Sequence, residues 1–73
     1  MNEEMLARAR ERVPDVRLFI NGVSKRASQL AKGAPRLIAM LPNDERSYLD
    51  IALQEVAEGK VIISYGDDIR PQD

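Results

Sequence analysis

The sequence predicts a small all-α domain with three helices, an extended apolar loop and a short extended segment near the C-terminus. Apolar residues recur with helical periodicity in three stretches, at about residues 2–12, 15–33 and 47–58. Proline or glycine stands at or just beyond the end of each stretch, where a helix is expected to stop. A chain of 73 residues is expected to form one domain over residues 1–73, with its core within about residues 13–63.

The helix predicted within residues 15–33 organises the rest of the chain. Asp15 can cap its first turn, because a carboxylate accepts hydrogen bonds from free backbone N–H groups. Gly33 suits the left-handed position that ends many helices. At about 100° per residue, seven apolar residues share one arc that we expect to face the core: Val16, Phe19, Ile20, Val23, Ala27, Leu30 and Ala31.

The two other predicted helices are shorter. The first covers residues 2–12 and ends before Pro14, because the residue that precedes a proline avoids the helical conformation. The second begins at Asp44 or Ser47 and ends at Glu58, before Gly59. The apolar residues that we expect to face the core are Met5, Leu6, Ala9 and Val13 near the first helix, and Leu49, Ala52, Leu53 and Val56 on the second.

Two further segments are predicted to be non-helical. Residues 33–46 place Pro35 and Pro42 around four apolar residues, which predicts an extended loop of unusually apolar composition. Either this loop packs over the domain's own core, or part of it forms an apolar strip for a partner. The β-branched run at residues 60–65 predicts a short extended segment, and the polar residues 66–73 predict a flexible tail.

The composition excludes several classes of function. The chain has no cysteine and no histidine, so thiolate and imidazole metal sites and the usual general base are missing. Its serines have no histidine to activate them, and its adjacent acids are expected to be solvated. We therefore expect no catalytic residues, no metal and no cofactor on this chain. No apolar run approaches the length of a membrane span and the start is unlike a secretory signal, so we expect a cytoplasmic protein without membrane contact.

Basic residues are concentrated on the central predicted helix. Residues 15–33 carry four basic residues and one acid, whereas residues 47–73 carry two basic residues and six acids. Arg17, Lys25, Arg26 and Lys32 can contact phosphates, so a small independent DNA-binding or antitoxin-like regulator is one hypothesis. The basic part of this helix has no aromatic side chains to stack on bases, which weakens that hypothesis.

A second face of the central helix combines Leu18 and Gly22 with Lys25 and Gln29. A glycine at this place allows another backbone to approach closely. The face is either a solvated basic surface with one stray leucine or a contact surface for a partner chain.

Two motifs follow one another along the chain. The first is RASQL at residues 26–30, followed by Gly33 and by PRLI at residues 35–38. The second is IALQEV at residues 51–56, followed by GKV at residues 59–61. In this order and spacing they resemble the omega subunit family of bacterial RNA polymerase, which is related to the archaeal K subunit and to a small common subunit of the eukaryotic polymerases. The likeness covers about residues 13–63.

The resemblance implies a non-catalytic subunit that helps the β′ subunit to fold and to join an α2β assembly. RNA synthesis and its Mg²⁺ belong to the large subunits of that enzyme, and this chain would meet DNA only through the complex. The resemblance also gives the outward faces of the helices a role. From helix geometry we predict that partner binding uses Leu18, Gly22, Arg26, Gln29, Tyr48 and Ile51. A generic helical adaptor is a third hypothesis.

The chain departs from the family pattern at three places. Ser28 stands where the family usually has a second arginine in the first motif, and Arg36 separates Pro35 from Leu37, where the family commonly has Pro followed directly by Leu. Some members use an M-A-R-V-like N-terminus to help form a guanosine tetraphosphate pocket. Residues 1–4 read MNEE here, and their acids would repel a polyphosphate, so we do not expect that site.

Overall fold

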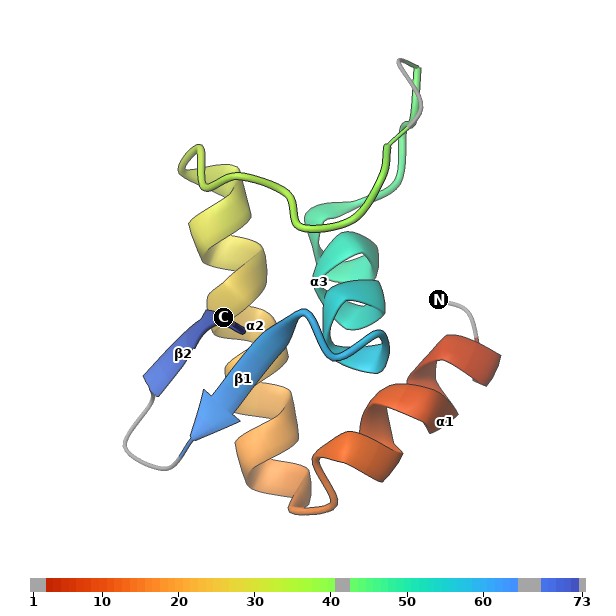
Figure 1. Ribbon diagram of the computed structural model, residues 1–73, viewed down its shortest axis with the longest axis vertical. Helices are drawn as coiled ribbons and strands as arrows, with labels where there is room; N and C mark the ends of the chain where they lie inside the picture. The colour runs from red at the N-terminus through yellow and green to blue at the C-terminus, as the bar shows by residue number, and fades with distance from the viewer. Residues whose placement is uncertain (1–2, 41–42, 65–67, 73) are drawn as a thin grey trace.

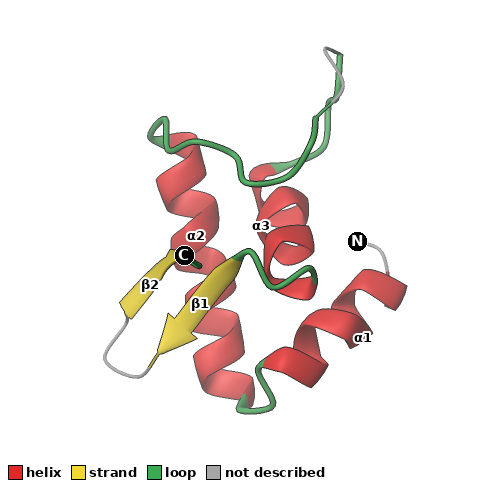
Figure 2. Cartoon of the chain, in the orientation of Figure 1, coloured by secondary structure: helices red, strands yellow, loops and turns green. Residues whose placement is uncertain are grey.

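The computed structural model describes residues 3–40, 43–64 and 68–72 (Figure 1). It confirms the three predicted helices and adds a small sheet. α3 packs against both α1 and α2, and the two strands lie against α2 (Figure 2). The elements in chain order are α1 (Glu3–Arg12), α2 (Val16–Ala31), α3 (Tyr48–Ala57), β1 (Val61–Ser64) and β2 (Asp68–Pro71).

The ends of α2 are those that the sequence predicts. The side chain of Asp15 accepts a hydrogen bond of 3.0 Å from the backbone N–H of Leu18, and Gly33 has a φ of 102°. The predicted apolar arc is too wide, however. Phe19, Val23 and Leu30 are buried, whereas Val16 and Ile20 at one edge of the arc are 54% and 55% exposed, and Ala31 is also exposed.

α3 is the most deeply buried helix. Ser47 caps it by accepting a hydrogen bond of 3.2 Å from the backbone N–H of Asp50. The predicted stripe is wrong at Leu49, which is 38% exposed, and it omits Ile51 and Glu55, which are 1% and 0% exposed. The cause is that α3 contacts α1 on one side and α2 on the other, so its buried surface is broader than a single stripe.

The C-terminal end corrects the prediction of a purely α-helical fold. β1 pairs with β2 in an antiparallel register that places Ile63 opposite Ile69 and Val61 opposite Pro71. Val61 and Ile69 are 6% and 8% exposed and belong to the core. The expected flexible tail is therefore wrong for residues 68–72, while residues 66, 67 and 73 of that tail lie outside the described residues. A lone strand cannot satisfy its backbone, and Ile69 supplies the apolar contact that fixes the second strand against α2.

The apolar loop between α2 and α3 packs on the domain's own core. Ile38 is 9% exposed within the core, and Leu37 and Met40 pack against it. The first of the two interpretations of this loop is thus confirmed for these residues, while Leu41 and Pro42 lie outside the described residues. In the described parts of the chain, no helix has both the length and the apolar character that crossing a membrane requires.

Candidate partner-binding surface

An apolar groove of about 250 Å³ lies between the three helices. Its lining is aliphatic and aromatic except for one hydroxyl group. We call it the helix groove, and its residues are Leu6 from α1, Phe19, Ile20, Val23 and Ser24 from α2, and Leu49 and Leu53 from α3. Among these, Ile20 and Leu49 are 55% and 38% exposed, so the groove presents apolar surface to the outside.

Two further large apolar residues are exposed beside these positions. Val16 lies one helical turn before Ile20 and is 54% exposed, and Tyr48 precedes Leu49 and is 42% exposed. The guanidinium carbon of Arg36 lies 5.8 Å from the centre of the Tyr48 ring, so the loop before α3 supports this tyrosine on one side. Scattered exposed apolar residues are ordinary, but these four lie beside or within one apolar groove and concentrate exposed apolar surface at one place.

A buried ion pair joins α2 to α3. Arg26 Nε lies 2.7 Å from Glu55 Oε1, and Arg26 Nη2 donates to Glu55 Oε2 at 3.2 Å. The two residues are 3% and 0% exposed, so water does not weaken the pair. Together the two contacts join the guanidinium and the carboxylate through two hydrogen bonds, which is the strong form of this ion pair.

The same pair holds the beginning of the loop that follows α2. Arg26 Nη2 donates to the carbonyl of Pro35 at 2.8 Å, and the backbone N–H of Leu37 donates to Glu55 Oε2 at 2.8 Å. Arg26 Nη1 also donates to Gln29 Oε1 at 3.1 Å. Every buried side-chain nitrogen and oxygen among the described residues has a hydrogen-bond partner, so the buried charges are satisfied.

The structure places the six predicted partner-binding residues in different surroundings. Arg26 and Ile51 are buried, as described above. Gly22 is buried as well, and a Cβ atom added to it would lie 2.5 to 2.8 Å from the side chain of Ile63. The close approach that the glycine predicts therefore takes place with the chain's own β1. Leu18 and Gln29 are half-buried and Tyr48 is exposed. The role of all six in partner binding stays a prediction.

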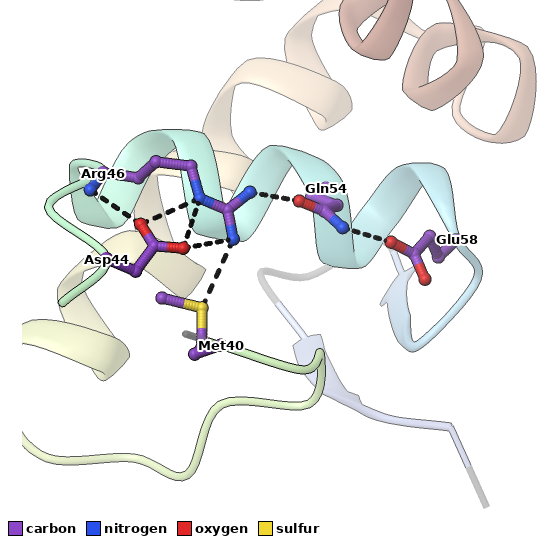
Figure 3. A network of polar contacts seen from close by, with 5 residues as sticks. All are labelled: Met40, Asp44, Arg46, Gln54 and Glu58. Carbon is purple, nitrogen blue, oxygen red and sulfur yellow. Dashed lines mark hydrogen bonds and ion pairs between the residues drawn. The ribbon is translucent and has the colours of Figure 1, made fainter. Parts of the chain in front are cut away.

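A polar chain of contacts runs along the exposed side of α3 (Figure 3). Arg46 donates to both carboxylate oxygens of Asp44 and also to Gln54, which in turn donates to Glu58. Arg46 Nη2 lies 3.4 Å from the sulfur of Met40. The side-chain hydrogen bond from Arg46 is the largest of the causes that lower the pKa of Asp44 below its ordinary value of 3.8. These contacts tie the end of the loop to α3.

The basic residues of α2 are less available than the sequence indicates. Arg17, Lys25 and Lys32 are exposed, but the charge of Arg26 is neutralised by Glu55 inside the protein. The positive charge that this helix can offer to phosphates at its surface is therefore smaller than the sequence indicates. In the ranges that the structure describes, no group of three acidic side chains is placed to hold a metal ion.

Two features of this region escape the sequence reasoning. Glu55 is an acid within the apolar run of α3, and this is the sequence signal for a buried pair, but its partner Arg26 is visible only in the structure. The helix groove has no comparable signal. It opens at Ile20, which lies on an edge of the arc that the neighbouring helices leave uncovered.

Known proteins resemble this chain over the region just described. The family described as RNA polymerase Rpb6 matches residues 20–63, which contain Arg26, Glu55 and both motifs. A DNA-directed RNA polymerase subunit omega from a Sulfurovum species is 43% identical over 63 residues, covering 85% of this chain and 91% of the relative. A subunit of the same name from Campylobacter lari is 39% identical over 62 residues, covering 84% of this chain and 85% of the relative. No solved structure matches the chain. The chain belongs to the RNA polymerase Rpb6 family, together with the bacterial omega subunits.

Proposed function

We propose that this chain acts as the omega subunit of a bacterial RNA polymerase, binds the β′ subunit and helps it to fold and to join α and β. The names of its relatives support a role as a polymerase subunit. The sequence offers no combination of residues typical of a catalytic site. RNA synthesis and its Mg²⁺ belong to the large subunits in this proposal. The compartment is then the cytoplasm, where bacterial transcription takes place.

The observation that carries the proposal is the exposed apolar surface at the helix groove. In the isolated chain, water contacts the exposed side chains of Val16, Ile20 and Leu49. Burying these apolar side chains against another protein is favourable. A domain of this size buries only a modest core, so partner binding adds stability that the chain lacks alone. The same mass action stabilises the partner, which is how a non-catalytic subunit supports the folding of a larger one.

The direct test is reconstitution of the polymerase from denatured subunits. β′ is refolded together with α and β, with and without this chain, and the yield of active enzyme is measured at several concentrations of the chain. We expect the yield to rise with concentration and to saturate near one chain per β′. A yield that does not depend on the chain would contradict the assembly role.

A second measurement separates this proposal from independent DNA binding. The tagged chain is isolated from cells with and without nuclease treatment, at low and at high salt, and β′, β and α are quantified. A largely apolar contact should persist in both cases, because salt screens phosphate contacts far more strongly. Loss of the polymerase subunits after nuclease treatment would instead mean that nucleic acid bridges them.

A further inference from the structure

We infer that the helix groove binds an amphipathic helix of the partner subunit, and that this helix places a carboxylate side chain beside Arg10. The inference rests on the proposed function, because it takes the occupant to belong to a polymerase subunit. It adds the form and the charge of the segment that fills the groove.

The hydrogen-bonding character of the groove selects a helix as its occupant. The lining consists of side chains on three α-helices, whose backbone N–H and C=O groups are largely used within the helices, and Ser24 supplies the one polar side chain. An extended segment would bury backbone groups here without partners, which is costly. A helix satisfies its own backbone and offers apolar side chains at every third and fourth position, as in other helix-in-groove complexes.

The charge at one end of the groove selects the carboxylate. The guanidinium carbon of Arg10 lies 5.5 Å from the centre of the Phe19 ring, which lines the groove. Arg10 Nη1 donates to the carbonyls of Val13 and Pro14, at 3.2 and 2.9 Å, and this holds the side chain in place. Among the residues that the structure describes, none accepts a hydrogen bond from Nε or Nη2 of Arg10, so both groups can donate to an acceptor of the partner.

Two acids stand close in sequence to residues that line the groove. Glu3 lies almost one turn before Leu6 at the other end of α1, and Asp50 follows Leu49 on α3. An acid of the partner is repelled at those positions and attracted at Arg10.

Arg36 lies 5.8 Å from the ring of Tyr48 and is a second cation beside the groove. We assign the carboxylate to Arg10 because Arg10 contacts Phe19, a residue of the groove lining.

A photo-crosslinking amino acid placed at Ser24 in the assembled polymerase identifies the occupant directly. The control position is Arg8, which is exposed on α1 and lies outside the groove. We expect Ser24 to crosslink to one segment of a polymerase subunit that has apolar residues at helical spacing and an acid near one end. A crosslink to a proline-rich or unpatterned segment, or none at Ser24 in a complex that still contains the chain, would overturn the inference.

Substitutions test the two contacts separately in a binding titration against the purified partner subunit. Ile20→Asp should weaken binding more than tenfold, whereas Ser28→Asp, an exposed site on α2 outside the groove, should not. Arg10→Gln should weaken binding by about tenfold, with Arg8→Gln, an exposed arginine on α1 outside the groove, as the control of equal charge change. Thermal unfolding of each free variant separates a lost contact from a lost fold.

The outcomes distinguish the inference from the proposed function. If the unaltered chain binds the polymerase and Ile20→Asp and Arg10→Gln bind equally well, the groove is not the docking site and the omega role stands. If the unaltered chain does not bind the polymerase, the proposed function fails and the inference fails with it.

Discussion

Arg26 and Glu55 stand 29 positions apart and meet as a fully buried ion pair, with Arg26 Nε 2.7 Å from Glu55 Oε1. Each residue belongs to one of the two motifs by which the chain resembles its relatives, so the motifs form a single structural unit. The pair also receives the N–H of Leu37 and donates to the carbonyl of Pro35. One contact therefore sets the spacing of α2 and α3 and the course of the loop between them.

Removal of one member of this pair should destabilise the chain severely. Glu55→Ala leaves the guanidinium of Arg26 buried without a counter-charge and takes the acceptor from the N–H of Leu37. We expect the free energy of unfolding to fall by roughly 3–5 kcal/mol, measured by urea denaturation followed by circular dichroism. A loss this large can exceed the stability of a small domain, so Glu55→Gln, which keeps the shape and one acceptor, is measured alongside and should lose less.

A double substitution shows whether the loss comes from the pair or from the positions. Arg26→Met combined with Glu55→Leu replaces the charges with apolar groups of similar size. The double variant should be more stable than Glu55→Ala alone, because no buried charge is left without a partner. The single variants Arg26→Met and Glu55→Leu complete the cycle. If the loss of the double variant equalled the sum of the two single losses, the two residues would act independently.

The effect of Gly22→Ala on the free energy of unfolding should change sign with the residue at position 63. In the natural chain the added Cβ meets Ile63 at 2.5 to 2.8 Å, and such overpacking costs about 1–3 kcal/mol. In an Ile63→Ala background the obstacle is gone, and the helical preference of alanine over glycine should stabilise the chain by about 1 kcal/mol. Urea denaturation of the four chains of this cycle provides the test, and a destabilisation of equal size in both backgrounds would contradict it.

The helices could be predicted from the sequence because their signals are local. Asp15 and Ser47 are polar residues placed just before periodic apolar runs, and Gly33 and Gly59 adopt the positive φ angles that end them. These features need only a few neighbouring residues. The structure confirms Asp15 and Gly33 in their predicted roles and selects Ser47 over Asp44 as the cap of α3. The exposed side of each helix depends on where the others lie, which periodicity does not contain. For this reason periodicity predicts Ile20 and Leu49 in the core and Ile51 on an outward face, whereas the structure exposes the first two and buries the third.

The strand pair and the candidate site depend on longer distances still. β2 is four residues long, and Ile69 is its one large aliphatic residue in a polar context, so its structure comes from pairing with β1 and packing on α2. The glycine at position 22 correctly indicated a close approach, but the sequence could not say that the approaching residue is Ile63 of the same chain. Tyr48 remains an exposed residue available to a partner.

The two N-caps should make similar and separable contributions. Asp15→Ala and Ser47→Ala each remove the acceptor of a backbone N–H in the first turn of α2 and α3. We expect each to lower the free energy of unfolding by about 1 kcal/mol, and the double variant by about their sum, since the caps share no partner. Ser28→Ala, an exposed position inside α2, is the control and should change stability little. If Ser28→Ala lowered the free energy of unfolding by the same amount, the loss of a polar side chain, and not the loss of a cap, would cause the effect.

Asp44 should titrate below its ordinary pKa because of Arg46. The side-chain hydrogen bond from Arg46 comes first among the causes, its backbone N–H second, and the charge of Arg36 last. A carboxyl whose pKa is lowered in the folded state stabilises that state above the ordinary pKa of 3.8, and this contribution disappears as the pH falls through the lowered pKa. Arg46→Gln should therefore raise the pKa of Asp44 toward 3.8, and Arg36→Gln should raise it less. Carboxyl carbon chemical shifts measured by NMR between neutral pH and the acid limit follow this group, and equal shifts in the two variants would contradict the assignment to the hydrogen bond.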